Sequence, residues 1–147
     1  MNFSDFITDH GKTVNKEYYL HLIQVSKIDG KINPSEMELL HKEGRKFGLT
    51  EPEIDELIIR EIHNNYHHPY SLKDKFKHLY NVAEMILADE VISESEKRMI
   101  RKFAVEAGFT DEAIDKLLDL LFEGISNNES EESMLAKFKS FLFKTDI

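Results

Sequence analysis

The chain has 147 residues, with 28 acidic against 19 basic side chains for a net charge of −9, and it contains no cysteine. This length suits one domain over residues 1–147, and the missing cysteines exclude disulfides, thiolate zinc sites and cysteine nucleophiles. An acidic surface disfavours nucleic acid and anionic membranes as partners, since both are bound by clustered Lys and Arg. The first residues lack the basic region and apolar stretch of a signal peptide, and no stretch approaches the ~20 apolar residues of a membrane span, so we expect a cytoplasmic protein.

The first predicted elements are two helices. Phe3, Phe6 and Ile7 predict a short N-terminal helix with an apolar edge. A second helix, over residues 15–28, is apolar around most of its circumference, which is typical of a buried helix. Residues 79–88 repeat this pattern, so we expect these two apolar helices to form the centre of the molecule.

Short polar motifs predict where the following helices begin and end. Asn33 before Pro34, and Ser93 in the second half, are N-cap residues with a glutamate three positions later that can bond back to the cap. Gly48 and Gly108 are suited to the left-handed conformation that ends a helix, and each is soon followed by a threonine N-cap. These motifs predict four capped helices.

The same helical unit occurs twice, 60 positions apart. Residues 29–58 align on 89–118 without a gap, and ten positions are identical where average composition gives roughly two. The identical pairs are Asp29/Asp89, Ile32/Ile92, Ser35/Ser95, Glu36/Glu96, Lys42/Lys102, Gly48/Gly108, Thr50/Thr110, Ile54/Ile114, Asp55/Asp115 and Leu57/Leu117. With repeats over about 15–64 and 71–125 and a last helix over about 129–144, we expect an all-α fold. It should have about seven helices, no sheet, and two three-helix units related by a pseudo-twofold axis.

The loop between Asp29 and Glu36 is similar to the second half of a calcium-binding EF-hand loop, but the preceding residues exclude that motif. The first two ligand positions fall on Val25 and Lys27, neither of which can ligate Ca²⁺. In the second copy the same positions fall on two apolar residues. The chain is therefore not an EF-hand protein.

An apolar helix that runs into Asp-Gly-x-Ile-x-x-x-Glu (29–36) is followed by a helix and a Gly-Leu-Thr border (48–50). The unit then recurs in a degenerate form in which Glu90 replaces the glycine. Over residues 15–125 this pattern resembles the tellurite-resistance TerB family, including the N-terminal domain of certain membrane-anchored DnaJ-like co-chaperones. The resemblance implies an all-helical, non-enzymatic module, linked in some members to stress responses and proposed to bind metal through acidic residues.

Asp29 and Glu36 match the acidic residues that this resemblance implies, and Asp89 and Glu96 are their counterparts in the second copy. A pseudo-twofold axis could bring the four carboxylates close enough to hold Ca²⁺ or Mg²⁺. Alternatively, the aspartates accept N–H bonds from their own loops while the glutamates complete the helix caps. One shared coordination sphere would favour the metal site, and separate loop bonds would favour the structural role.

His63, His67 and His68 form a second and separate metal candidate. His63 and His67 share one helix face if the helix persists to His67, as zinc-binding helices require. The third ligand would then be His68, Asp74 or His78. The competing interpretation is a solvated helix end, where histidine side chains are also favoured.

The last predicted helix carries one apolar stripe, made of Met134, Leu135, Phe138, Phe141 and Leu142. This stripe could fill the groove between the two repeats, or dock into a partner or a second copy of the chain to form a homodimer. We expect packing on its own domain, because an exposed apolar patch of that size is unusual in a monomer.

The sequence has no Gly-x-Ser-x-Gly elbow, no phosphate-binding glycine loop and no His-Glu-x-x-His motif. We therefore expect no enzymatic activity. The function we expect is a non-catalytic binding or scaffolding module with a protein partner. The alternative is a divalent-cation-binding protein that uses the carboxylates of the two repeated motifs.

Overall fold

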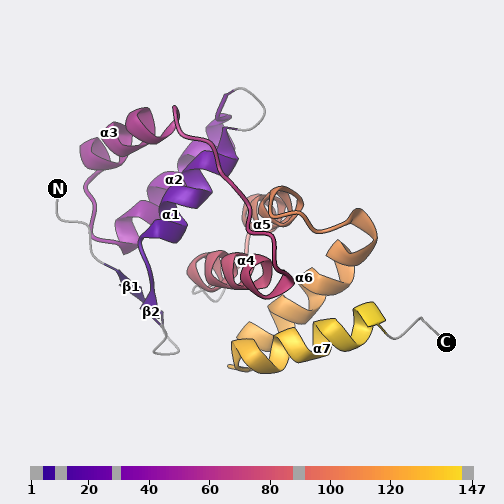
Figure 1. Ribbon diagram of the computed structural model, residues 1–147. Helices are drawn as coiled ribbons and strands as arrows, with labels where there is room; N and C mark the ends of the chain where they lie inside the picture. Colours follow the sequence, from indigo (N-terminus) through magenta and orange to yellow (C-terminus); the bar gives the residue numbers. More distant parts are fainter. Residues whose placement is uncertain (1–4, 9–12, 28–30, 88–91, 144–147) are drawn as a thin grey trace.

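The computed structural model describes residues 5–8, 13–27, 31–87 and 92–143 of the chain. This part contains a two-stranded antiparallel sheet and seven helices (Figure 1). The elements are β1 (Phe6–Ile7), β2 (Thr13–Val14), α1 (Glu17–Ser26), α2 (Pro34–Lys46), α3 (Glu51–Glu61), α4 (Leu72–Ile86), α5 (Glu94–Glu106), α6 (Asp111–Ser126) and α7 (Glu131–Phe143). The all-α class predicted from the sequence is confirmed.

The N-terminal segment forms a short hairpin, so the predicted N-terminal helix and the predicted absence of a sheet were wrong. Phe6 pairs with Val14 and Ile7 with Thr13. Ile7, Thr13 and Val14 are β-branched residues, which favour extended backbone, and Val14 is buried where β2 meets α4. Phe3 lies outside the described residues.

Helices α1 and α4 form the centre of the molecule, as predicted. Each helix contacts the other, and both contact α5. Their fully buried apolar residues are Tyr19, Leu22, Ile23 and Val25 from α1, and Phe76, Leu79, Val82, Ala83, Met85 and Ile86 from α4. These side chains join those of the surrounding helices in one hydrophobic core, whose removal from water is the main favourable contribution to folding.

The helices fall into a first unit, α1–α3, and a second unit, α4–α6. Helices α2 and α5 begin and end 60 residues apart, and α3 and α6 begin 60 residues apart. Gly48 and Gly108, with φ values of 84° and 99°, end α2 and α5 in the left-handed region, as predicted. Thr50 forms a capping box with Glu53, whereas Thr110 holds the N-cap position of α6 without a side-chain cap bond.

The two units differ in the length of their third helix. Helix α6 ends at Ser126, whereas α3 ends at Glu61, whose counterpart in α6 is Leu121. Ile125 buries its side chain in the last turn of α6, but the first unit has Asn65 at this position. Without an apolar residue to bury, α3 stops early. The helix therefore does not continue to His67, which was the condition for the zinc hypothesis.

Helix α7 packs on α4 and α6, so its main contacts lie within the second unit (Figure 1). Met134 and Phe138 are fully buried, which confirms that the apolar stripe packs on its own domain. The Phe138 ring lies between those of Phe76 and Phe109, at centroid distances of 6.2 and 5.8 Å. The predicted location in the groove between the two repeats was wrong, because these aromatic partners both belong to the second unit.

Candidate functional site

The N-termini of α2 and α5 are held by matching capping boxes. Asn33 Oδ1 accepts a hydrogen bond from the Glu36 amide at 2.8 Å, and Glu36 Oε1 accepts one from the Asn33 amide at 3.2 Å. In α5, Ser93 Oγ accepts from the Glu96 amide at 3.1 Å, and Glu96 Oε1 accepts from the Ser93 amide at 2.9 Å. Both predicted caps are confirmed, and each satisfies backbone donors that have no partner within the helix.

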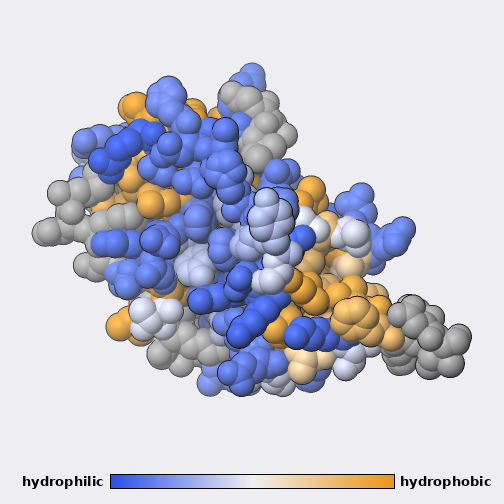
Figure 2. Space-filling model, in the orientation of Figure 1, coloured by the Kyte–Doolittle hydropathy of each residue, from blue (hydrophilic) through white to orange (hydrophobic). Residues whose placement is uncertain are grey.

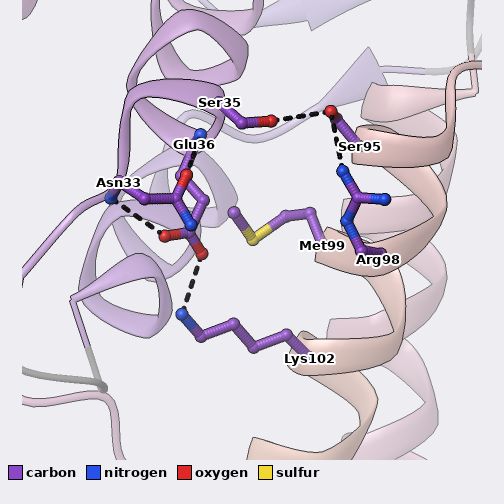
Figure 3. Close-up of a pocket in the computed structure, with 7 residues that line it drawn as sticks. All are labelled: Asn33, Ser35, Glu36, Ser95, Arg98, Met99 and Lys102. Atoms are coloured by element: carbon purple, nitrogen blue, oxygen red, sulfur yellow. Dashed lines mark hydrogen bonds and ion pairs between the residues drawn. The ribbon is translucent and has the colours of Figure 1, made fainter.

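The second oxygen of each glutamate faces a lysine of the other unit. Lys102 Nζ lies 2.8 Å from Glu36 Oε2 (Figure 3), and Lys42 Nζ lies 3.4 Å from Glu96 Oε2. Lys102 Nζ also donates to the carbonyl oxygen of Ser26 at the end of α1, at 3.1 Å. The two ion pairs are reciprocal, because residues 36 and 42 of one unit meet residues 102 and 96 of the other. They join α2 to α5.

Ser35 and Ser95 hydrogen-bond to each other where α2 meets α5, with their Oγ atoms 2.7 Å apart (Figure 3). We call this contact between α2 and α5 the seam. Two hollows share these serines among their lining residues. The hollow in Figure 3 has a volume of about 200 Å³ and is lined by Asn33, Ser35, Glu36, Ser95, Arg98, Met99 and Lys102. The other has a volume of about 310 Å³ and is lined by Ser35, Glu38, Leu39, Lys42, Arg45, Ser93, Ser95 and Glu96.

Glu36 and Glu96 both make the contacts expected if they complete the helix caps rather than bind a metal ion. Each uses one carboxylate oxygen on its own cap and the other on a lysine ammonium, and Glu96 is only 2% exposed. Among the described residues, no three or more His, Asp or Glu side chains are grouped so that they could hold a metal ion. Asp29 and Asp89 lie outside the described residues, so the four-carboxylate site stays a prediction.

The three clustered histidines lie in the connection between α3 and α4 rather than on one helix. His63, His67 and His68 are exposed, and the chain at His67 and His68 has no helical assignment. Of the third-ligand candidates, Asp74 lies in the first turn of α4, where its amide donates to Ser71 Oγ. His78 hydrogen-bonds to the hydroxyl of Tyr66 at 3.0 Å. The structure does not bring the predicted zinc ligands onto one helix face.

A pair of stacked histidines that the sequence analysis missed lies between α1 and α4. The rings of His21 and His78 are 5.1 Å apart and nearly parallel, and Tyr18 and Tyr66 pack edge-on or tilted against them. Burial lowers the pKa of both histidines, and the positive charge of His21 contributes to the lowering at His78. Because these residues are far apart in the sequence and outside the repeat alignment, no local pattern indicated their contact.

The sequence analysis also missed a buried carboxylate, Glu43. Its side chain is 0% exposed and lies 2.7 Å from Lys46 Nζ, which also donates to the Met85 carbonyl oxygen at 2.9 Å. The position equivalent to Glu43 in the second unit is Phe103, a fully buried aromatic residue. An acid aligned with an apolar core position was therefore the signal that could have indicated this ion pair.

His41 joins α2 to α3 in a way that should make stability depend on pH. Its ring nitrogens bond to Glu51 and, at 2.8 Å, to Asp55. Burial alone would lower the pKa of His41, but the hydrogen bonds and charges of the two carboxylates outweigh it and raise the pKa. The resulting stabilisation is complete below the unfolded-state pKa of about 6.5 and is lost as the pH rises through the higher folded-state value. The loss should be below about 1 kcal/mol, because the carboxylates are exposed.

The second unit supplies the control for this prediction. Arg101 and Asp115 occupy the positions of His41 and Asp55, and they form an ion pair at 2.6 Å that does not titrate near neutral pH. We expect the unfolding free energy of the wild type, measured by urea denaturation, to fall relative to that of His41→Arg as the pH rises from 6 to 8.5. Identical pH profiles for the two proteins would contradict the assignment, since the contributions of His21 and His78 are common to both.

The Lys102–Glu36 ion pair should contribute measurably to stability. Both side chains are mostly buried, at 18% and 14% exposed. We expect Lys102→Met to lower the unfolding free energy by about 1–3 kcal/mol, because it leaves a mostly buried carboxylate without its cation. Adding Glu36→Gln should recover part of this loss, since glutamine keeps the capping bond without the charge. Equal losses in the single and double variants would contradict a charge-based coupling.

Lys97 provides the control for helix α5. Its ammonium lies 3.6 Å from the carboxylate of Glu94, and both side chains are exposed. We expect Lys97→Met to change the unfolding free energy by less than about 0.5 kcal/mol, as is typical of exposed pairs.

Comparisons with protein-family models, with curated proteins and with solved structures give no match to this chain. The TerB resemblance therefore stays a prediction that depends on the residues quoted above. In the part of the chain that the structure describes, none of the helices has the length and apolar character required to span a membrane.

Proposed function

We propose that this protein is a non-catalytic binding and scaffolding module for a protein partner. We propose further that its two units arose by duplication and are related by a pseudo-twofold axis. Two observations support the second part. Ser35 and Ser95 are equivalent positions of the repeat and bond to each other. The 60-residue offset also converts the Lys102–Glu36 ion pair into the Lys42–Glu96 pair, because Glu36 is equivalent to Glu96 and Lys42 to Lys102. In this proposal the recurring motif holds the two units together. The TerB resemblance adds a stress-associated role in the cytoplasm.

The observation that carries the proposal is an apolar hollow beside α7, outside the seam between the units. It has a volume of about 230 Å³ and is lined by Tyr70, Leu72, Lys75, Gly108, Phe109, Thr110, Ala113, Phe138 and Leu142. Tyr70 is 97% exposed at this hollow. Partner-binding surfaces commonly combine a concave apolar region with an exposed aromatic side chain.

Site-specific photo-cross-linking tests whether the protein holds a partner. A benzophenone amino acid would replace, one at a time, the exposed large apolar residues of the described part of the chain: Ile7, Ile59, Tyr70, Val105 and Phe143. After illumination of cells that express the protein, we expect a discrete adduct with one other protein from at least one position. The absence of adducts from all five positions would overturn the proposal.

Thermal unfolding separates this proposal from the cation-binding alternative. A cation at a hundred times its dissociation constant adds about 2.7 kcal/mol of stability, which raises the Tm of a domain of this size by roughly 5–10 °C. For a binding module we expect no rise when Ca²⁺ or Mg²⁺ is added to EDTA-treated protein. A rise that Asp29→Asn abolishes would contradict the proposal, and a rise with Zn²⁺ alone would indicate the histidines between α3 and α4.

A further inference from the structure

The apolar hollow beside α7 continues to the molecular surface. Figure 2 shows apolar residues gathered where the C-terminal end of α7 meets the start of α6. The floor of the hollow is formed by core residues, because Phe138 is 0% exposed, Ala113 6% and Phe109 9%. Its rim is formed by the exposed Tyr70 and by the partly buried Leu72 and Leu142. We call these lining residues, with Lys75, Gly108 and Thr110, the α7 groove.

The size of the α7 groove suits a side chain better than a small molecule. Its volume is about 230 Å³, whereas pockets that enclose drug-sized ligands begin at about 300 Å³. A single bulky apolar side chain, inserted from a peptide segment, would lie on the floor formed by Phe109 and Ala113 and beside the exposed Tyr70. Such an anchor is the usual centre of a helix-in-groove or peptide-in-groove interface.

The charge of the α7 groove indicates that the ligand carries an acidic group beside its apolar side chain. Among the described residues that line the groove, Lys75 is the charged one and none is an acid. Within the described residues Lys75 has no ion-pair partner. Its ammonium lies against Gly108, where a β-carbon would come within 2.9 Å of Nζ, so the glycine leaves room for this cation beside the apolar floor.

We infer that the α7 groove binds a segment of a partner protein in which a bulky apolar residue lies within one helical turn of an Asp or Glu, on either side of it. The apolar side chain fills the groove, and the carboxylate pairs with Lys75. A cation bordering an apolar pocket selects against basic partners as well as for acidic ones. This inference depends on the proposed binding function and specifies the surface and the chemistry of the partner.

A random peptide library displayed on phage and selected on the intact protein would test the inference. We expect the enriched peptides to share a bulky apolar residue with an acid one to four positions before or after it. A fluorescein-labelled copy of the most enriched peptide is then the probe for fluorescence anisotropy. We expect Lys75→Glu to weaken its binding at least about tenfold and Tyr70→Ala at least about fivefold, as for groups at the centre of an interface.

Two controls make the test specific. Lys73→Glu introduces the same charge change on the same helix at an exposed residue that does not line the groove, and we expect less than about a twofold effect. A probe in which the acid is replaced by lysine should recover binding to the Lys75→Glu variant to within about threefold of the original pair. Neither Tyr70 nor Lys75 is a buried core residue, so both variants should fold.

The outcomes separate this inference from the proposed function. Enriched peptides without an acid, or peptides that bind the Lys75→Glu variant unchanged, overturn the inference. Photo-cross-links from Ile7, Ile59 or Val105 alone also overturn it, while the binding function then stands. A complex between two copies of this chain, with concentration-dependent mass and loss on Tyr70→Ala, would overturn it in favour of self-association. No cross-links and no enriched peptides would remove both proposals together.

Discussion

Replacing Lys46 by methionine should lower the free energy of unfolding by about 3–5 kcal/mol. The Lys46 ammonium lies 2.7 Å from a carboxylate oxygen of Glu43, whose side chain is completely buried. Methionine retains most of the volume of lysine but removes the positive charge, so Glu43 would remain ionised in the core or take up a proton. Either consequence favours the unfolded state, in which the carboxylate is hydrated. Urea denaturation at pH 7 measures the loss.

The double variant Glu43→Leu/Lys46→Met distinguishes this charge effect from a loss of packing. It removes both members of the pair, and we expect its stability to return to within about 1 kcal/mol of the wild type. The donor to the Met85 carbonyl oxygen is absent from both variants, so the difference between them isolates the buried charge. The second unit has Phe103 at the equivalent of Glu43, which shows that this core position accepts an apolar residue. A double variant as unstable as Lys46→Met would contradict the argument.

The parts of the fold that were predictable from the sequence are those determined by local chemistry. Asn33 and Ser93 were identified as caps because a side-chain oxygen followed three residues later by glutamate satisfies the backbone at short range. Gly48 was identified as a helix end because glycine adopts positive φ without a steric cost. These rules operate within a few residues and need no knowledge of packing.

The candidate site depends on long-range geometry that the sequence does not contain. Lys42/Lys102 and Glu36/Glu96 were recognised as identical positions of the repeat, but their partners depend on how α2 packs against α5. The sequence therefore left two roles open for the glutamates, metal ligand or helix cap, and did not indicate that each also pairs with a lysine. The missed hairpin has a different cause, since strands of two residues are too short to show the alternating pattern of a sheet.

Replacing Phe138 by alanine should destabilise the protein by about 3–5 kcal/mol, the range for truncating a fully buried aromatic residue. The Phe138 ring packs among Phe76, Phe109 and Phe141, and it holds α7 against the second unit. An alanine would leave a cavity that the fully buried Phe76 cannot fill without losing its own contacts. We expect Phe138→Ala to have a lower urea midpoint than the wild type. Its hydrogen exchange should be accelerated more at the α7 amides than at the α1 amides.

Phe143→Ala is the matched control, because it makes the same substitution on the same helix at a side chain that is 65% exposed. We expect it to change the unfolding free energy by less than about 0.5 kcal/mol. Comparable losses for Phe138→Ala and Phe143→Ala would contradict the packing of α7 on its own domain. They would indicate instead that the apolar stripe is buried in an assembly, which gel filtration over a range of concentrations would detect. A large loss at Phe138 with little change at Phe143 would show that α7 packs through Phe138 on its own domain, while the exposed Phe143 side chain is not buried in an assembly.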